Sequence, residues 1–116
     1  MNVLVVANDP PYGTERCYNA LRLAASLAKR EEASVRVFLM ADAVGCAVTK
    51  QVLPNGYYHL DRMLTSAVRH GAEVGLCGTC MDARAVDASK LVEGAHRSSL
   101  EELTDWTLWA DKIVTF

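Results

Sequence analysis

Short apolar runs alternate along this chain with segments whose apolar residues recur at helical spacing, and this alternation restricts the fold more than any other feature. The first run, Val3–Ala7, is almost entirely apolar, which is typical of a strand covered on both faces. Helical spacing follows it, in Cys17, Ala20, Leu21, Ala24, Leu27 and Ala28. Strands alternating with helices predict an α/β fold, in which a parallel sheet lies between helices on both faces.

The remaining elements are placed by the same spacing and by turn residues. Further strands are expected at Val35–Met40, Ala72–Leu76, Lys90–Val92 and Lys112–Phe116. Helices are expected after the cap residues Thr14 and Asp42, from Tyr57 to His70, from Cys80 to about Val86, and behind two overlapping capping boxes in Ser98–Glu102. No repeat or linker interrupts this order, so residues 1–116 are expected to form a single domain.

Composition excludes several classes of function. The net charge is −2, and no cluster of Lys or Arg is present, which argues against a nucleic-acid partner. No apolar run approaches the roughly 20 residues of a membrane span. Since the chain starts directly with an apolar strand and not with a signal peptide, we expect a cytoplasmic protein. Four cysteines in a reducing compartment suggest catalysis or metal binding more than structural disulfides.

Ligands of parallel α/β sheets bind outside the carboxyl ends of the strands. This rule brings three segments to one edge, namely Asn8 with Asp9, residues 40–42, and the sequence Cys77-Gly78-Thr79-Cys80. Asn8 and Asp9 either cap their loop or form one wall of a cleft, and both interpretations stay open. The cysteine sequence carries the densest chemical signal, because two thiols lie three positions apart on a strand-to-helix turn.

A helix start at this turn would favour a thiolate. Thr79 is expected to be the N-cap, so that free N–H groups of the first turn stabilise an ionised Cys80. Arg84 lies one turn further on the same face and adds to this effect, whereas Asp82 opposes it. The pKa of Cys80 is therefore expected to be modestly lowered. Cys80 is the predicted nucleophile, and Cys77 is the predicted resolving thiol.

Two alternatives for the cysteine pair stay open. Both thiols can be inert core residues, since free cysteine is among the most buried residue types. A zinc site is the other alternative, because C-x-x-C supplies half of a tetrahedral ligand set. The other candidate ligands are scattered singly, as Cys17, Cys46, His59, His70 and His96. We expect neither a metal nor a cofactor, and we expect Cys17 and Cys46 to lie in the core.

With these motifs in place, the chain resembles the DsrE/DsrF-like family of sulfur-relay proteins, which includes the TusD type, nearly from end to end. The similarity is carried by Asn8–Arg16, Asn19–Ala24, Gly56–Tyr58, Leu76–Arg84 and Trp109–Phe116. The second of these stretches and the cysteine segment are the specific parts. Ala85 departs from the pattern, because it stands where similar sequences usually have glycine.

This resemblance implies a three-layer α/β/α fold with a five-stranded, mainly parallel sheet, and assembly into homotrimers or hexamers. Members of the sulfur-relay branch carry a persulfide on a cysteine that aligns best with Cys80. The expected function is a sulfurtransferase or persulfide carrier that exchanges sulfur with a donor or acceptor protein. A thiol–disulfide redox protein and a non-enzymatic oligomeric binding module are the alternatives. Neighbouring subunits are expected to cover Tyr57, Tyr58, Trp106 and Trp109.

Overall fold

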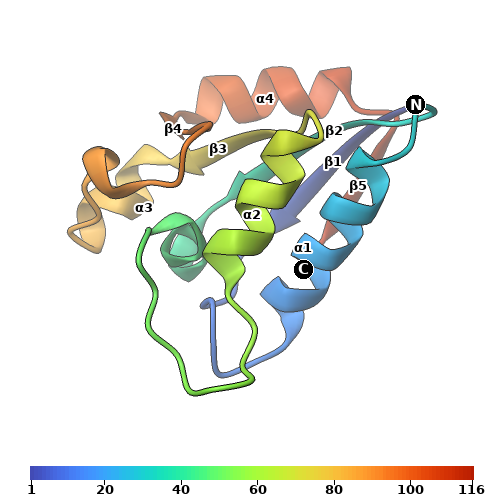
Figure 1. Cartoon of the computed structure of the whole chain (residues 1–116). Coiled ribbons are helices and arrows are strands. Elements are labelled where there is room, and N and C mark those ends of the chain that lie inside the picture. Colours follow the sequence, from blue (N-terminus) through green and yellow to red (C-terminus); the bar gives the residue numbers. More distant parts are fainter.

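Five parallel strands form one sheet in the computed structural model, which describes residues 1–116 (Figure 1). The strands are β1 (Asn2–Ala7), β2 (Ser34–Leu39), β3 (Glu73–Cys77), β4 (Ala95–Ser98) and β5 (Lys112–Thr115), in the spatial order β4-β3-β2-β1-β5. The helices are α1 (Arg16–Ala28), α2 (Leu60–Arg69), α3 (Gly78–Ala83) and α4 (Leu100–Trp109), and two 3-10 helices are η1 (Ala41–Ala47) and η2 (Ala88–Lys90). The predicted α/β class and five-stranded sheet are confirmed, and every strand pair is parallel.

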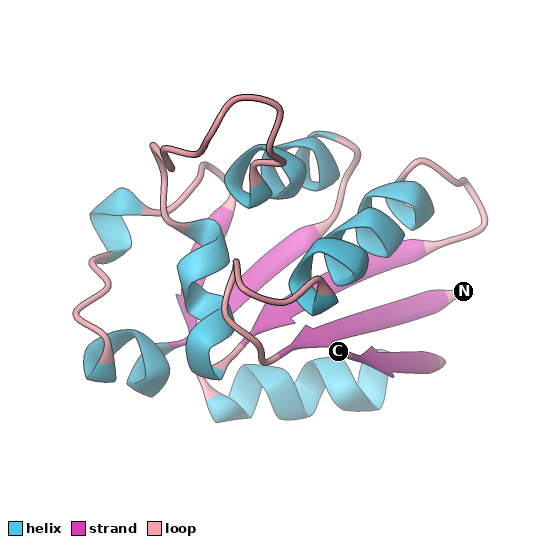
Figure 2. Cartoon of the chain, turned by 90° about the horizontal axis from the view of Figure 1, so that it is seen from below, coloured by secondary structure: helices cyan, strands magenta, loops and turns pink.

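Helices cover the two faces of the sheet unequally (Figures 1 and 2). One face carries α1, α2 and η1 over a core cluster of 22 buried residues. On the other face α4 lies alone, over a cluster formed by Leu4, Val6, Phe38 and Trp106. Successive side chains of a strand point to opposite faces, so β1 contributes to both clusters and has to be apolar throughout. None of the helices combines the length and the apolar character that a membrane crossing requires.

Helix faces follow the predicted spacing, but the helix starts differ. The buried face of α1 consists of Cys17, Ala20, Leu21 and Ala24. Thr14 lies one residue before the N-cap position, which Glu15 holds without a side-chain capping bond; the Thr14 hydroxyl accepts the N–H of Arg16 at 3.5 Å and donates to Asp9. Asp42 lies within the first turn of η1, where Met40 holds the cap position. The start of α2 is Leu60 and not Tyr57.

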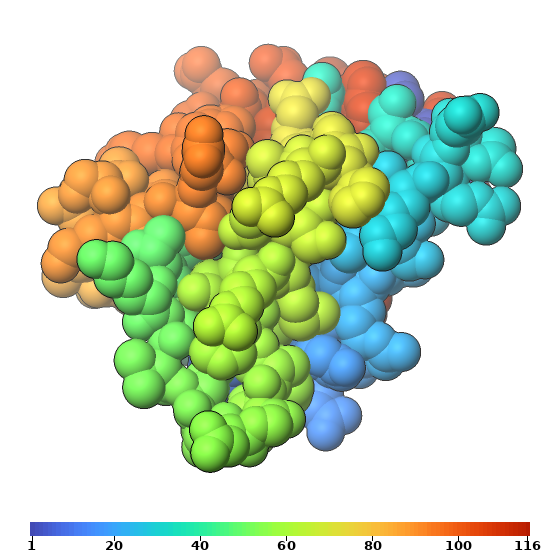
Figure 3. Space-filling model, in the orientation of Figure 1, coloured from blue at the N-terminus to red at the C-terminus, as the bar shows by residue number.

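One strand lies elsewhere than predicted. The Lys90–Val92 segment starts at the last residue of η2 and forms only an isolated antiparallel bridge, between Leu91 and Val48, so the loop after η1 lies beside it (Figure 3). The fourth strand is instead the polar sequence Ala95–Ser98, which pairs with β3 alone. An edge strand buries little surface, so its residues need not be apolar, and hydrophobic patterning could not find it.

Candidate functional site

The carboxyl ends of β1, β2 and β3 lie at one edge of the sheet, as predicted. In register, Ala7 pairs with Leu39, and Leu39 pairs with Leu76. The loops that follow these strands therefore leave the sheet side by side. Cys77 is the last residue of β3, and Cys80 lies one turn into α3.

The Cys77 thiol is held by hydrogen bonds at the start of α3. Its sulfur occupies the N-cap position and accepts the backbone N–H of Cys80 at 3.4 Å, and the Thr79 hydroxyl lies 3.3 Å away. Partial burial raises the pKa of Cys77, but hydrogen bonds from the Cys80 thiol, the Thr79 hydroxyl and the backbone amides of both residues outweigh it and lower the pKa below that of an ordinary cysteine. Cys77 is therefore the thiol of the pair that ionises first.

The Cys80 thiol faces η1 instead. Its sulfur accepts the backbone N–H of Ala41 at 3.2 Å. Burial and the hydrogen bond shared with Cys77 raise the pKa of Cys80, and the Ala41 amide and the Arg84 charge offset this only in part. Ala41 presents its N–H from the left-handed region, at φ 52°, which is costly for a residue with a Cβ.

Two predictions about this loop are therefore wrong. Thr79 does not cap α3, because the helix already begins at Gly78 and the Cys77 sulfur takes the capping position. The pKa of Cys80 is raised and not lowered, because burial of the thiol and its interaction with Cys77 outweigh the Ala41 amide and the Arg84 charge. An N–H group at the helix start does stabilise a thiolate as predicted, but this thiolate is Cys77, whereas the Arg84 charge acts on Cys80.

Two arginines fix the loop to its neighbours. Arg84 donates to the Asp42 carboxylate at 2.8 Å and to the Cys80 carbonyl at 3.2 Å, which joins α3 to η1. Arg97 of β4 makes two hydrogen bonds to Asp82, at 2.7 and 2.9 Å, which joins α3 to the edge strand. This pairing lowers the pKa of Asp82. Asp82 and Arg84, predicted as charges acting on Cys80, thus act mainly by holding α3 in place.

Gly78 permits β4 to lie directly against the cysteine loop. A Cβ at this position would lie 2.9 Å from Cζ of Arg97 and 2.9 Å from the carbonyl oxygen of Ser98. Backbone atoms cannot move aside as the end of a side chain can. The glycine between the two cysteines is therefore required by packing.

A cavity of about 600 Å³ opens beside Cys77, between the end of the sheet and the start of α4. Its lining residues are Phe38, Met40, Cys77, Gly78, Thr79, Arg97, Ser98, Ser99, Leu100 and Leu103. Cys77 packs against the smaller core on the α4 side, whereas Cys80 packs against the larger core on the opposite side. The two cysteines therefore pack against different core clusters, and of the two only Cys77 borders this cavity.

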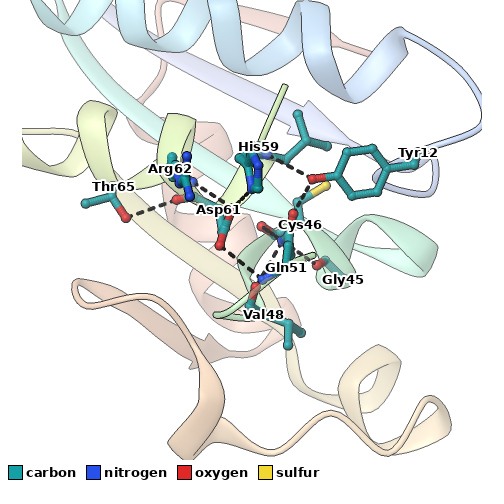
Figure 4. A network of polar contacts seen from close by, with 10 residues as sticks. Tyr12, Gly45, Cys46, Val48, Gln51, His59, Asp61, Arg62 and Thr65 are labelled. Atoms are coloured by element: carbon teal, nitrogen blue, oxygen red, sulfur yellow. Dashed lines mark hydrogen bonds and ion pairs between the residues drawn. The ribbon is translucent and has the colours of Figure 1, made fainter. Parts of the chain in front are cut away.

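A polar network holds η1, which carries the Ala41 contact (Figure 4). The side-chain amide of Gln51 donates to three carbonyl groups at the end of η1, those of Gly45, Cys46 and Val48, at 3.4, 3.0 and 2.9 Å. The Tyr12 hydroxyl donates to Gln51 and accepts the N–H of Leu60 at 3.1 Å. One side chain thus links η1 to the β1 loop and, through Tyr12, to the start of α2.

Asn8 and Asp9 lie at the predicted edge, but no hydrogen bond joins them to Cys77 or Cys80. The N–H and the side-chain amide of Asn8 both donate to the carbonyl of Phe116, at 3.0 and 3.4 Å, and join β1 to the end of β5. The Asp9 carboxylate accepts the Thr14 hydroxyl at 3.2 Å. Neither residue lines the cavity. Of the two interpretations left open, the contacts fit loop capping.

Cys17 and Cys46 are fully buried in the larger core, as predicted. The Cys17 thiol donates to the Asp9 carbonyl at 3.0 Å, and the interaction of Cys46 with Cys17, together with burial, raises the pKa of Cys46. No group of three or more His, Cys, Asp or Glu side chains is arranged to hold a metal ion.

Three residues of the site were missed in the sequence. Ala41 acts through its backbone N–H, which no side-chain pattern reveals. Arg97 lies in the edge strand that hydrophobic patterning overlooked. Leu100 has the pattern of an ordinary helical residue, yet it is 76% exposed and lines the cavity. The rule on strand ends would place Arg97 at this edge, but only once β4 is recognised as a strand.

Known proteins match this chain along its whole length. The sequence pattern of the DsrE/DsrF-like family matches residues 1–116. The chain belongs to this family. Protein YchN of Escherichia coli strain K12 is 40% identical over 115 residues, which cover 98% of this chain and 97% of YchN. The uncharacterized protein MJ0989 of Methanocaldococcus jannaschii is 34% identical over 116 residues, which cover 100% of both chains.

The crystal structure of YchN from E. coli has the same architecture as this DsrE-like chain. Its TM-score is 0.92 at 40% identity, and the match covers 99% of this chain and 98% of YchN. The departure at Ala85 now has a structural context, because this residue adopts φ 52° just after α3. A glycine would take this conformation at no steric cost, which fits the glycine that the family resemblance implies at this position.

Proposed function

We propose that this DsrE-like protein carries a sulfur atom as a persulfide on Cys77, from which an external acceptor thiol or the neighbouring Cys80 removes it. One observation carries the proposal: the Cys77 sulfur has a lowered pKa, from the hydrogen bonds around it, and borders an open cavity. Nucleophilic attack on a sulfane sulfur needs an ionised and accessible thiol. The two roles are the reverse of those predicted from the sequence.

The transfer is a thiol exchange in two balanced steps. The Cys77 thiolate attacks the outer sulfur of a donor R–S–SH, the S–S bond of the donor breaks, and RS⁻ leaves with the bonding electrons. Cys77–S–SH remains on the protein. An acceptor thiolate then attacks the outer sulfur, and Cys77 leaves as a thiolate again. A donor and an acceptor protein would supply the two external thiols.

A thiol–disulfide redox function is the second candidate, because the Cys80 N–H donates to the Cys77 sulfur and so holds the two cysteines side by side. In this case the Cys80 thiolate attacks the Sγ atom of Cys77–S–SH and expels HS⁻. A Cys77–Cys80 disulfide forms, and the two electrons given up by the cysteines reduce the sulfane sulfur to sulfide. This outcome uses the same residues but ends without a bound sulfur atom.

Intact-mass measurement after incubation of the reduced protein with polysulfide separates these functions. The carrier gains the mass of one sulfur atom, loses it on reduction, retains the gain in Cys80→Ser and fails to gain it in Cys77→Ser. The redox protein loses two hydrogen atoms and releases sulfide, and both variants abolish this. Absence of either change would contradict both functions and leave a binding module with inert cysteines. The buried Cys17 and Cys46 should stay unmodified throughout.

A further inference from the structure

We infer that the cavity beside Cys77 selects sulfur donors that carry an apolar organic group over small inorganic donors such as thiosulfate. The inference rests on the proposed function, because it names the class of molecule from which Cys77 takes its sulfur.

The cavity offers an apolar wall next to the reacting sulfur. Phe38 and Met40, from the end of β2 and the residue after it, and Leu103 of α4 form this wall together with Leu100. Its volume is about 600 Å³, whereas a cavity of roughly 150 Å³ already accommodates benzene. An aryl or alkyl group therefore has room beside Cys77, and its transfer from water onto this wall is favourable.

Nothing in the lining offers a free positive charge to an inorganic anion. Arg97 is the only charged residue of the lining. Both of its terminal nitrogens are engaged by the Asp82 carboxylate, at 2.7 and 2.9 Å. A small dianion would lose hydration in this cavity without gaining an unpaired cation in return.

Leu100 marks the open side of the cavity. It is the first residue of α4, it lines the cavity, and its side chain is 76% exposed. An exposed leucine alone has no special meaning, but here it continues the apolar wall outward. Leu108 on the same helix is 83% exposed and does not line the cavity, so it serves as a matched control.

Organic thiosulfonates are suitable probes, because the reacting group and charge stay constant while the organic group changes. The Cys77 thiolate attacks the terminal sulfur of R–SO₂–S⁻, the S–S bond breaks, and the sulfinate R–SO₂⁻ leaves with the bonding electrons. Cys77–S–S⁻ remains, so no other reactant is needed. Benzenethiosulfonate and methanethiosulfonate differ only in R.

The test compares the rates at which the protein gains one sulfur atom from these two probes and from thiosulfate, each divided by the rate with free cysteine. The normalised rate for the benzene compound should exceed that for the methane compound by about tenfold or more, because the additional apolar group is bound by the wall. Leu100→Ser should reduce this ratio, whereas Leu108→Ser should leave it unchanged. Thiosulfate should be the slowest donor.

The possible results distinguish a failure of the donor preference from a failure of the proposed persulfide function. Equal normalised rates for the two thiosulfonates in the unaltered protein would overturn the inference and leave the persulfide function standing. A faster normalised reaction with thiosulfate than with the benzene compound would overturn it too. If no donor, polysulfide included, adds sulfur to Cys77, the proposed function itself fails.

Discussion

Two alanines near the cysteine loop adopt backbone conformations that favour glycine, and they differ in what they do. Ala41 and Ala85 both have φ 52°, which costs about 1–2 kcal/mol for a residue with a Cβ. Ala41 presents its N–H to the Cys80 sulfur from this conformation, so its strain is linked to the site. Ala85 follows α3 and binds neither sulfur through its own N–H, which donates to Asp82. The backbone strain at Ala85 can therefore be removed without loss of a contact to either sulfur.

Ala85→Gly should stabilise the protein. Relief of the strained φ should outweigh the greater entropy of glycine in the unfolded chain, with a net gain of up to about 1 kcal/mol in the free energy of unfolding. Ala83→Gly is the matched control, since Ala83 lies in α3 and is also exposed. It should lower the free energy of unfolding by about 0.5–1 kcal/mol. Urea denaturation measures both, and the same sign for both variants would contradict the explanation.

Thr79 should control the ionisation of Cys77. A group whose pKa is lowered in the folded protein is ionised above that pKa and protonated below it, so Cys77 should react with iodoacetamide at neutral pH ahead of Cys80. Thr79→Val removes the hydroxyl that lies 3.3 Å from the sulfur, which should raise the pKa of Cys77 and move the midpoint of its pH–rate profile upward. Thr79→Ser should restore the original midpoint. Identical midpoints in all three proteins would exclude this role.

Among the secondary-structure elements, η1 depends most on a single side chain outside it. The three carbonyl groups at its C-terminal end have the Gln51 amide as a common donor. The Gln51 side chain also accepts a hydrogen bond from the Tyr12 hydroxyl. The backbone N–H of Gln51 donates to the buried Asp61 carboxylate at 3.4 Å. The position of Ala41 against Cys80 therefore depends on Gln51, a residue of the loop that follows η1.

Gln51→Ala should destabilise the protein by about 1–3 kcal/mol, because buried carbonyl groups and the Tyr12 hydroxyl lose their partner. Gln51→Glu keeps the size of the side chain but removes the amide donor, so it should cost at least as much. Val52→Ala is the control, since Val52 is 95% exposed, and it should change stability by less than about 0.5 kcal/mol. Equal stability of all variants in urea denaturation would show that the network is dispensable.

The elements that could be predicted are those whose burial leaves a pattern in the sequence. β1, β2 and β3 are buried on both faces and are apolar for that reason, and their ends located the cysteine loop. The polar edge strand β4 leaves no such pattern, so the sequence could not predict that Arg97 lines the cavity. The proposed roles of the two thiols depend on where α3 begins. A start at Gly78 gives Cys77 the cap position that was expected for Thr79, and no local propensity determines a helix boundary to that accuracy.

At the scale of the whole molecule, the two faces of the sheet are covered to different degrees. The α4 side has the smaller core, and Trp106, expected to be covered by another subunit, is buried there within the chain itself. Trp109 stacks under the Arg36 guanidinium, 4.0 Å from the ring centroid. Apolar surface remains at Leu108 and at Ile113, which lies on the edge strand β5. β5 pairs only with β1, so its outer edge is unpaired.

This unpaired edge and its apolar residue lead us to expect self-association through the β5 side, which light scattering at micromolar concentration would detect as a mass above that of one chain. Ile113 is 47% exposed, and Ile113→Lys should weaken the association by about tenfold or more, because a lysine on the edge opposes pairing with a second copy. Val52→Lys adds the same charge at an exposed apolar residue in the loop between η1 and α2, and should leave the mass unchanged. A single-chain mass for the unaltered protein would contradict self-association, and equal effects of the two lysines would place the interface away from β5.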